Sequence, residues 1–405
     1  MELPERTDCV ARFDAGSHVP SGRAAGGGTR RQAVPVRRRS PGAAAAPWPE
    51  GRPCGQEAQA TTCPPLTARA FLVESSSSTG QSGVSSPAGA DITAALECVL
   101  ATKISVQMCS YNRADLLERA LEALVKVDFP TEDFEIVLVD DGSSDGTREM
   151  VAGLHHDRRL KYLYQDNAGL ATARNTGIRA AEGEVVLFID DDTMADPNLL
   201  KEHWATHQED DRCVVNGRVN HVESLDVELS PKFTTADIST SFFWTSNVSV
   251  RRRYLEQVGL FDEDFREYGW EDLELGGRLR DLGLRRRYNH NALVYHYKRR
   301  RLASELPRIL RQSAACGRSA VVYLRKRPRL RTRMATGLFG WRIVLNDIAR
   351  IVRPCCLRTV ERAGDRELIG LVGFCARLLA SFEYYEAVKT ALRAQRNGQG
   401  PGPAK

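Results

Sequence analysis

The sequence contains no uninterrupted apolar stretch of about 18 residues, the length that a membrane-spanning helix requires. Its longest apolar run covers residues 368–376 and ends at Arg377. The 10 cysteines form no C-x-x-C pair and show no zinc-ligand spacing, so neither a disulfide scaffold nor a structural zinc site is expected. No apolar segment follows a charged start, which argues against a secretory signal. We therefore expect a cytoplasmic protein. This location also allows peripheral attachment to the inner face of the membrane.

The first 98 residues lack hydrophobic periodicity and are rich in Gly, Pro, Ser, Ala and Arg. Such a composition cannot bury enough apolar surface to fold, so residues 1–98 are expected to be a disordered tail. A translation start near Val99, which a GTG codon could encode, is the alternative. The whole chain of 405 residues is 42% hydrophobic, which suffices for one large core and a smaller C-terminal layer.

The C-terminal third is predicted to be helical and basic, and we expect a helical extension over residues 301–405. Basic runs occupy residues 285–287, 298–301 and 325–333, although the net charge of the whole chain is only +5. No helix-turn-helix, zinc or RNA-binding signature accompanies these runs, so nucleic acid is not an expected partner. Anionic lipid headgroups or a polyprenyl-phosphate acceptor fit the charge better. A solvated helical face is the alternative.

Three consecutive acids end the most distinctive strand signal of the chain. The apolar run at residues 185–189 is typical of a strand buried on both faces, and Asp190, Asp191 and Asp192 follow it directly. Carboxylates at such a strand end lie where open α/β sheets bind ligands. Adjacent acids repel one another, and a hard cation such as Mg²⁺ or Mn²⁺ would relieve that repulsion. A solvated acidic turn is the alternative.

A second acidic strand end lies upstream, where Asp140 and Asp141 follow the apolar run at residues 134–139. Gly142 and Gly146 permit a tight turn there, and the polar residues between them can cap the next helix. A well-made strand-to-helix turn explains the glycines. It does not explain two acids at the strand terminus itself.

An earlier strand and an arginine-bearing helix complete the pattern. Residues 103–108 alternate like a first strand and lead into a helical repeat. Between the two acidic strand ends, a loop leads into a helix of small residues that carries Arg174. An arginine facing a strand-end cleft suits a phosphate, and a surface arginine is the alternative. The alternation of strands and helices predicts a parallel sheet with right-handed crossovers.

Four segments, in this order and spacing, resemble the successive motifs of family 2 glycosyltransferases. They are Ser110–Arg113, Val139–Thr147, Asn167–Gly177 and Asp190–Asp192. The resemblance covers roughly residues 103 to 297 and implies an α/β fold of the GT-A type, with a mostly parallel Rossmann-like sheet flanked by helices. It also implies a nucleotide-diphosphate sugar donor, most often a UDP-sugar, and a divalent metal, Mn²⁺ or Mg²⁺. We expect the transferase domain at 99–300, with a donor half at 99–195 and an acceptor half at 196–300.

The resemblance assigns the nucleoside to side chains at the first two strand ends. Tyr111, Asn112 and Arg113 would line the nucleoside. Asp141 would contact the base or the ribose, with Asp140 as the alternative.

The same resemblance places the diphosphate and the metal. Arg174 would face the diphosphate. Asp192 would ligate the metal directly, and Asp190 would touch the ribose or the metal, with Asp191 between them at the donor. His296, at the end of a later strand, would complete the metal site; a hydrogen-bonded structural histidine is the alternative.

Acceptor and catalytic roles fall on the second half of the domain. Trp244, Asn247 and Trp270 are acceptor candidates, and a core aromatic cluster is the alternative for Trp244. Glu271 and Asp272 match the "ED" motif of the family, and they lie in the first turn of a predicted helix, where capping alone could explain one acid. Asp272 is expected to be the general base, with Glu271 as the alternative or as an acceptor-positioning residue.

The absence of a Gln-x-x-Arg-Trp sequence, which marks processive synthases, favours single sugar addition. We expect an inverting glycosyltransferase that acts on a saccharide or lipid-linked saccharide in envelope or exopolysaccharide assembly. Glycosylation of a small natural product or peptide, and a nucleotide-sugar binding module without catalysis, are the alternatives. A nucleotidyltransferase is disfavoured because no Gly-rich Lys/Arg loop follows the first strand.

Removing residues 1–98 should leave both stability and activity unchanged, because their composition offers no core. The melting temperature and the rate of donor turnover, compared between the full chain and a chain beginning at Val99, measure this. A large drop in melting temperature on truncation would show that the tail packs on the domain.

Overall fold

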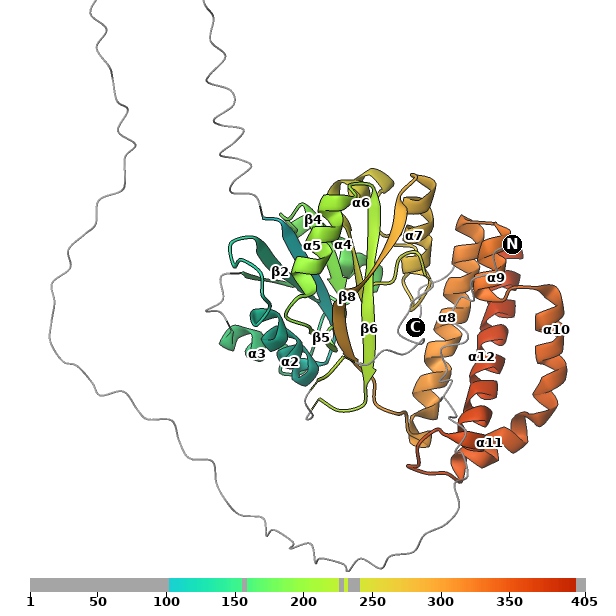
Figure 1. Cartoon of the computed structure of the whole chain (residues 1–405). Helices are drawn as coiled ribbons and strands as arrows, with labels where there is room; N and C mark the ends of the chain where they lie inside the picture. The colour runs from blue at the N-terminus through green and yellow to red at the C-terminus, as the bar shows by residue number, and fades with distance from the viewer. Residues whose placement is uncertain (1–101, 155–158, 226–228, 232–240, 398–405) are drawn as a thin grey trace, which may run out of the picture. The chain divides into compact units, whose positions relative to one another are not determined.

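The computed structural model describes residues 102–154, 159–225, 229–231 and 241–397 (Figure 1). The tail predicted at 1–98 lies outside these residues. The described part of the chain forms an eight-stranded sheet in the order β3-β2-β1-β4-β7-β6-β8-β5. Helices pack on the sheet, and a bundle of helices follows it in the sequence.

The first half of the sheet is entirely parallel. Its strands are β1 (Ile104–Ser110), β2 (Phe134–Asp140), β3 (Leu160–Tyr164) and β4 (Val185–Ile189), connected by α2 (Ala114–Val125), α3 (Thr147–Gly153) and α4 (Leu170–Ala180). Parallel strands that follow one another through helices end at the same edge of the sheet. The polar segments after β1, β2 and β4 therefore meet at one edge, as the sequence predicts.

The second half of the sheet is mixed. Its strands are β5 (Thr193–Ala195), β6 (Cys213–Val222), β7 (Asn247–Arg251) and β8 (Arg285–Tyr297), with α5 (Leu199–Glu209), α6 (Arg252–Val258) and α7 (Glu271–Asp281). Strand β7 is antiparallel to β4 and β6, β5 is antiparallel to β8, and β6 is parallel to β8. The predicted α/β fold of the GT-A type is confirmed, and its parallel character resides mainly in the donor half.

Two hydrophobic cores cover the two faces of the sheet. Along β4, Val186 and Phe188 enter one core, whereas Val185, Leu187 and Ile189 enter the other. Successive side chains of a strand point to opposite faces, so a strand covered on both sides must be apolar throughout. This is why β4 carries no polar residue until the chain reaches the edge of the sheet.

The C-terminal part is helical, as predicted. It contains η2 (Ala303–Glu305), α8 (Leu306–Lys326), α9 (Leu330–Thr336), α10 (Gly340–Ala349), η3 (Arg350–Val352), α11 (Arg353–Glu361) and α12 (Gly370–Arg396). Helix α8 packs along α12 and also joins a core of the sheet domain through Cys316, Ala320 and Tyr323. Among the described helices, none combines the length and the apolar character needed to cross a bilayer.

A buried polar network lies between α5 and β7. The Ser249 hydroxyl lies 2.8 Å from Nδ1 of His203 and 2.8 Å from Nε2 of His207. Nε2 of His203 lies 2.8 Å from Oδ1 of Asn247. Burial lowers the pKa of His203 to about 4 and that of His207 to about 3, so both rings are neutral at pH 7.

Mild acid should therefore destabilise the fold. In the unfolded chain both histidines titrate near 6.5, so below that pH the unfolded state binds more protons than the folded state. The two histidines should make the free energy of unfolding fall as the pH decreases from about 6.5 to 4, contributing a slope that approaches about 2.7 kcal/mol per pH unit for two protons. Asp191, whose pKa is raised to about 6 by burial, takes up its proton in the folded state below that pH and offsets up to about half of this slope. Urea denaturation at a series of pH values measures the net slope. His207→Gln should remove the contribution of one proton, about 1.4 kcal/mol per pH unit, and a profile that this substitution leaves unchanged would contradict the assignment.

Candidate active site

Each of the three acids after β4 contacts a different neighbouring side chain. The Ser246 hydroxyl donates to Oδ2 of Asp190 at 2.6 Å. The Ser110 hydroxyl donates to Oδ2 of Asp191 at 2.9 Å. Asp192 lies beside His296, whose Nε2 is 3.1 Å from Oδ1 of the carboxylate.

Arg113 neutralises part of this charge. Its Nη1 donates to Oδ1 of Asp191 and to Oδ2 of Asp192, at 2.9 Å in each case. Burial nevertheless raises the pKa of Asp191 to about 6, helped by the neighbouring Asp192 and opposed by Arg113 and the Ser110 hydroxyl. Asp191 is thus held against the sheet end, while Asp190 and Asp192 face the remaining side chains of the cluster.

Strand pairing brings His296 to the acids. Strand β5 begins at Thr193, immediately after the acids, and pairs antiparallel with β8 so that Thr193 lies opposite His296. The backbone N–H of Tyr297 donates to the carbonyl of Asp192 at 2.9 Å. A residue more than 100 positions downstream is therefore fixed beside Asp192 by the backbone ladder itself.

Asp190, Asp192 and His296 could hold a metal ion. One ligand atom from each lies within 4.8 Å of the other two. Nδ1 of His296 is buried and makes no hydrogen bond within the described part of the chain. Two carboxylates and an imidazole are a donor set that suits Mn²⁺, and the carboxylates alone also suit Mg²⁺. The side chains present fit a divalent cation.

The two acids at the end of β2 accept hydrogen bonds from other groups of the protein. Asp140 accepts from the hydroxyl of Tyr162 at 2.7 Å and from the backbone N–H of Ser143 at 2.8 Å. Asp141 accepts from the side-chain amide of Gln165 at 2.7 Å and from the N–H of Gly169 at 3.1 Å. Both carboxylates are buried. They hold the turn and the loop that would surround a nucleoside.

Asn112 ties the end of β1 to the same turn. Its side-chain oxygen accepts from the N–H of Ser144 at 2.8 Å, and its own N–H donates to the hydroxyl of Ser143 at 2.9 Å. The backbone of Asn112 is left-handed, with φ of 54°, a conformation that asparagine tolerates better than most residues. Tyr111, just before it, is 50% exposed. The first-strand motif thus offers an exposed ring on a rigid support.

Arg174 is buried and paired. Its Nη1 lies 2.7 Å from Oε1 of Glu271, and its Nη2 donates to the hydroxyl of Thr245 at 2.7 Å. Burial opposes the charge, but the carboxylates of Glu271, Asp190 and Asp272 outweigh it and raise the pKa of Arg174. The arginine therefore links the acid cluster electrostatically to the start of α7.

Asp272 lies in the first turn of α7, which a sharp bend precedes. Gly269 and Trp270 have φ of 102° and 78°, so the chain reverses before the helix begins at Glu271. Oδ1 of Asp272 accepts from the N–H of Leu273 at 2.8 Å. Unlike Glu271, the side chain of Asp272 is only partly buried.

The three acceptor candidates lie in the interior. Trp270 is fully buried, and its indole N–H donates to the carbonyl of Cys316 at 2.9 Å. Asn247 is buried, and its amide donates to the carbonyls of Arg218 and Ala292. Trp244 is buried as well. The structure does not bring these side chains to an open surface beside the acids.

Thr245 and Ser246 were missed by the sequence reasoning. Together with Asn247 they are three consecutive polar side chains, and each contacts a different part of the site: Arg174, Asp190 and the β6–β8 pair. The available signal was a pair of hydroxyl side chains between Trp244 and Asn247, both of which were already selected as acceptor candidates.

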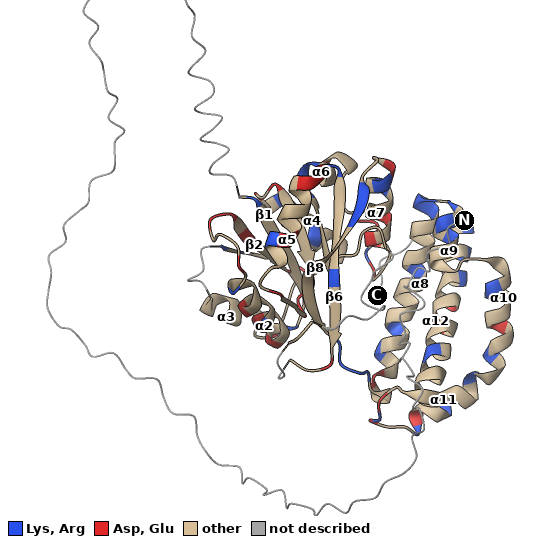
Figure 2. Ribbon diagram, in the orientation of Figure 1, with Lys and Arg blue, Asp and Glu red and all other residues tan. Residues whose placement is uncertain are grey.

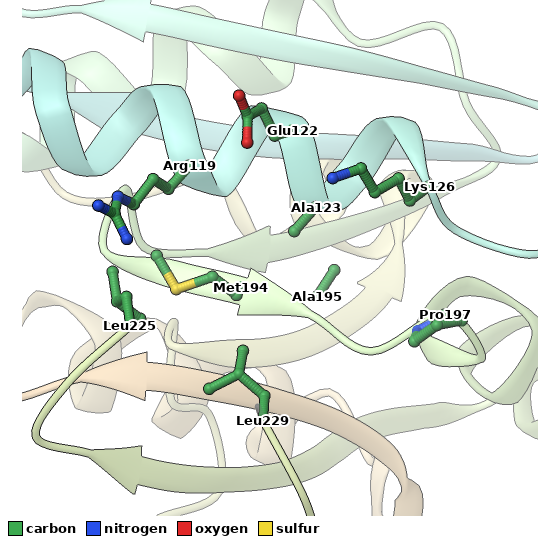
Figure 3. Close-up of a pocket in the computed structure, with 9 residues that line it drawn as sticks. All are labelled: Arg119, Glu122, Ala123, Lys126, Met194, Ala195, Pro197, Leu225 and Leu229. Atoms are coloured by element: carbon green, nitrogen blue, oxygen red, sulfur yellow. The ribbon is translucent and has the colours of Figure 1, made fainter. Parts of the chain in front are cut away.

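A hollow of about 310 Å³ lies elsewhere, lined by residues of α2 and β5 together with Pro197, Leu225 and Leu229 (Figure 3). Met194 and Ala195 line it from β5, and Arg119 and Lys126 line it from α2. None of the site residues discussed above lines it.

Comparison with known proteins identifies relatives. The model of the family described as Glycosyl transferase family 2 matches residues 105–259. Validoxylamine A glucosyltransferase of Streptomyces hygroscopicus subsp. jinggangensis is 35% identical over 219 residues, which cover 45% of this chain and 52% of that protein. Chondroitin synthase of Escherichia coli is 26% identical over 236 residues, covering 48% of this chain and 34% of that protein. The chain spans about half the length of the first of these relatives and a third of the second.

One solved structure is distantly similar to this chain. A mannosyltransferase of Pyrobaculum calidifontis, in complex with GDP-Man and Mn²⁺, is 20% identical, with a TM-score of 0.45. The alignment covers 72% of this chain and 87% of that chain. A likeness at this score does not assign a ligand.

Asp192→Asn should weaken Mn²⁺ binding by about 100-fold or more, since it removes one of three ligands without changing side-chain shape. Arg113 keeps its bond to Asp191, so the fold should persist. Titration of free Mn²⁺ by electron paramagnetic resonance measures the affinity. Asp196→Asn, an acid outside the cluster, is the matched control. Equal Mn²⁺ affinity in the Asp192→Asn variant and the unaltered protein would show that the metal lies elsewhere.

Proposed function

Residues 105–259 match the model of glycosyl transferase family 2, and on that premise we propose that the chain is an inverting, metal-dependent glycosyltransferase. Its donor is a nucleotide-diphosphate sugar, with UDP-sugars favoured. Its acceptor is a saccharide or a lipid-linked saccharide in envelope or exopolysaccharide synthesis. The observation that supports this most is the cluster of Asp190, Asp192 and His296 at the strand ends, joined electrostatically through Arg174 to Asp272.

The proposed chemistry is a direct displacement at the anomeric carbon. Asp272 accepts the proton of the acceptor hydroxyl as the new C–O bond forms. The bond between the anomeric carbon and the phosphate oxygen breaks, and the nucleoside diphosphate leaves with the electron pair. Asp190, Asp192 and His296 hold a divalent cation, which, when bound, offsets the charge that develops on the departing diphosphate.

The remaining side chains support these two centres. We assign the nucleoside to the surface around Tyr111 and the turn that Asn112 and Asp141 fix. Arg174 donates hydrogen bonds to Glu271 and Thr245. In this proposal it therefore aligns Glu271 and places a positive charge near the diphosphate. Such preorganised charges act without rearrangement during the reaction.

A small natural product is the second candidate acceptor. The observation that favours it is the similarity to validoxylamine A glucosyltransferase, whose name denotes transfer of glucose to a small molecule. The similarity to chondroitin synthase favours a saccharide chain instead.

An assay of nucleoside diphosphate release separates the proposed classes. A panel of nucleotide sugars is incubated with Mn²⁺, first alone and then with oligosaccharides or validoxylamine A as acceptors. A transferase releases nucleoside diphosphate slowly from one donor, and faster when its acceptor is added. A binding module releases nothing, and a nucleotidyltransferase releases pyrophosphate.

Asp272→Asn should lower kcat by about 10²- to 10⁴-fold, the usual contribution of a general base. Donor affinity and melting temperature should stay close to those of the unaltered protein, because asparagine still accepts the N–H of Leu273. Steady-state kinetics with saturating donor, together with donor titration, measure the two effects separately.

Glu271→Gln is the matched variant. It removes the carboxylate that pairs directly with the buried guanidinium of Arg174, and breaking a buried pair of this kind costs about 3–5 kcal/mol. This variant should therefore lose melting temperature, which Asp272→Asn does not. Full activity of Asp272→Asn would show that the base lies elsewhere. If Glu271→Gln is inactive but as stable as the unaltered protein, Glu271 is the general base and Asp272 positions the acceptor.

A further inference from the structure

Helix α10 and the adjoining η3 expose an apolar stripe to solvent. Trp341, Leu345, Ile348 and Ile351 are 62%, 55%, 65% and 83% exposed, and Val344 is exposed between them. At about 100° per residue, these positions fall within an arc of roughly 120° on one face of the helix. Single exposed apolar residues are ordinary, but a continuous stripe marks an interaction surface.

The polar side of the same helix faces inward. Asp347 pairs with Lys389 of α12 at 2.6 Å, and the Ser381 hydroxyl of α12 donates to Asn346 at 3.1 Å. Asn346 is the buried residue of α10. Apart from Ile343 and Ala349, which pack on buried clusters, the large apolar residues of the helix face water while Asn346 and Asp347 contact α12.

Ion pairs extend this orientation into η3 and α11. Arg350 pairs with Glu386, and Arg353 lies 2.8 Å from Glu383. Both acids belong to α12. A helix held by several charged contacts along one side cannot rotate its apolar stripe inward without breaking them.

The start of α12 exposes further apolar side chains. Ile369, Leu371 and Phe374 are 59%, 69% and 51% exposed. The end of α10 and the start of α12 pack in one hydrophobic cluster through Ala349 and Val372. The exposed apolar side chains of the two helices therefore belong to segments that pack on the same buried cluster.

The surrounding charge is strongly positive. Residues 301–397 contain 20 Lys and Arg against 7 Asp and Glu, and the basic residues are distributed over α8 to α12 in Figure 2. Exposed arginines include Arg342, Arg358, Arg362 and Arg366. The guanidinium of Arg342 lies 5.7 Å from the ring centroid of Trp341, at the margin of the stripe.

We propose that the exposed stripe of α10–η3, with the start of α12, binds the surface of an anionic phospholipid bilayer. The apolar side chains enter the boundary between headgroups and acyl chains, and the arginines contact the lipid phosphates. Charge complementarity selects this partner over a second copy of the chain. A symmetric contact between two copies would bring the arginine-rich margins together, whereas an anionic surface neutralises them.

Vesicle flotation with the full chain tests the proposal. Vesicles of phosphatidylcholine containing about one third phosphatidylglycerol are compared with vesicles of phosphatidylcholine alone. We expect at least about ten-fold tighter binding to the anionic vesicles, weakened by added salt. Emission from Trp341, identified by its loss in Trp341→Phe, should shift to shorter wavelength on binding.

Two double variants assign the binding to the stripe. Leu345→Ser with Ile348→Ser should weaken binding about ten-fold or more without changing the melting temperature, because both side chains are exposed. Val125→Ser with Tyr268→Ser changes two equally exposed residues of the sheet domain and should leave binding unchanged. Equal effects of the two pairs, or no preference for anionic vesicles, would overturn the proposal. Sedimentation velocity that finds a dimer dissolved by the Leu345/Ile348 pair, with no vesicle binding, would assign the stripe to self-association instead.

Discussion

The crowding of negative charge at the end of β4 is the constraint around which the site is arranged. Three successive carboxylates cannot share one small region of low dielectric without compensation. Arg113 from the first strand motif contacts Asp191 and Asp192, His296 from the last strand also lies beside Asp192, and the Ser246 hydroxyl donates to Asp190. The pKa of Asp191 nevertheless remains raised to about 6, because of its burial first and its neighbouring carboxylates second. A bound cation would supply the balance and would make the same charge useful for holding a diphosphate.

The tripeptide at the start of β7 connects this charge to the rest of the domain. Ser246 holds Asp190, Thr245 holds Arg174, and Asn247 bonds to both β6 and β8. Strand β8 carries His296 past a bulge after Gly217, where an added Cβ would come within 2.3 Å of both the carbonyl oxygen of Ala292 and the amide of Asn247. The distance between Asp192 and His296 is therefore set mainly by the backbone pairing of β5 with β8. Such a site is preorganised in the sense that catalysis by electrostatics requires.

The sequence allowed the donor half of the sheet to be predicted because its signals are local. Apolar runs that end in Asp140 or Asp190 fix both the strand and its functional end. The mixed half was less accessible, because its strands pair over long separations that no local pattern encodes. The burial of Trp270, an acceptor candidate in the sequence, was also not predicted, because it depends on packing against α8, where the carbonyl of Cys316 accepts from its indole N–H. Likewise, the basic composition of the C-terminal helices was evident, whereas the outward apolar face of α10 depends on ion pairs to α12.

Anomalous diffraction from crystals grown with Mn²⁺ and a nucleoside diphosphate would test the central claim most directly. The account predicts one strong peak within bonding distance of Asp192 and His296, with Asp190 beside it and the diphosphate on its open side. A peak coordinated by Glu271 or Asp141, or no peak at the end of β4 under saturating Mn²⁺, would contradict it.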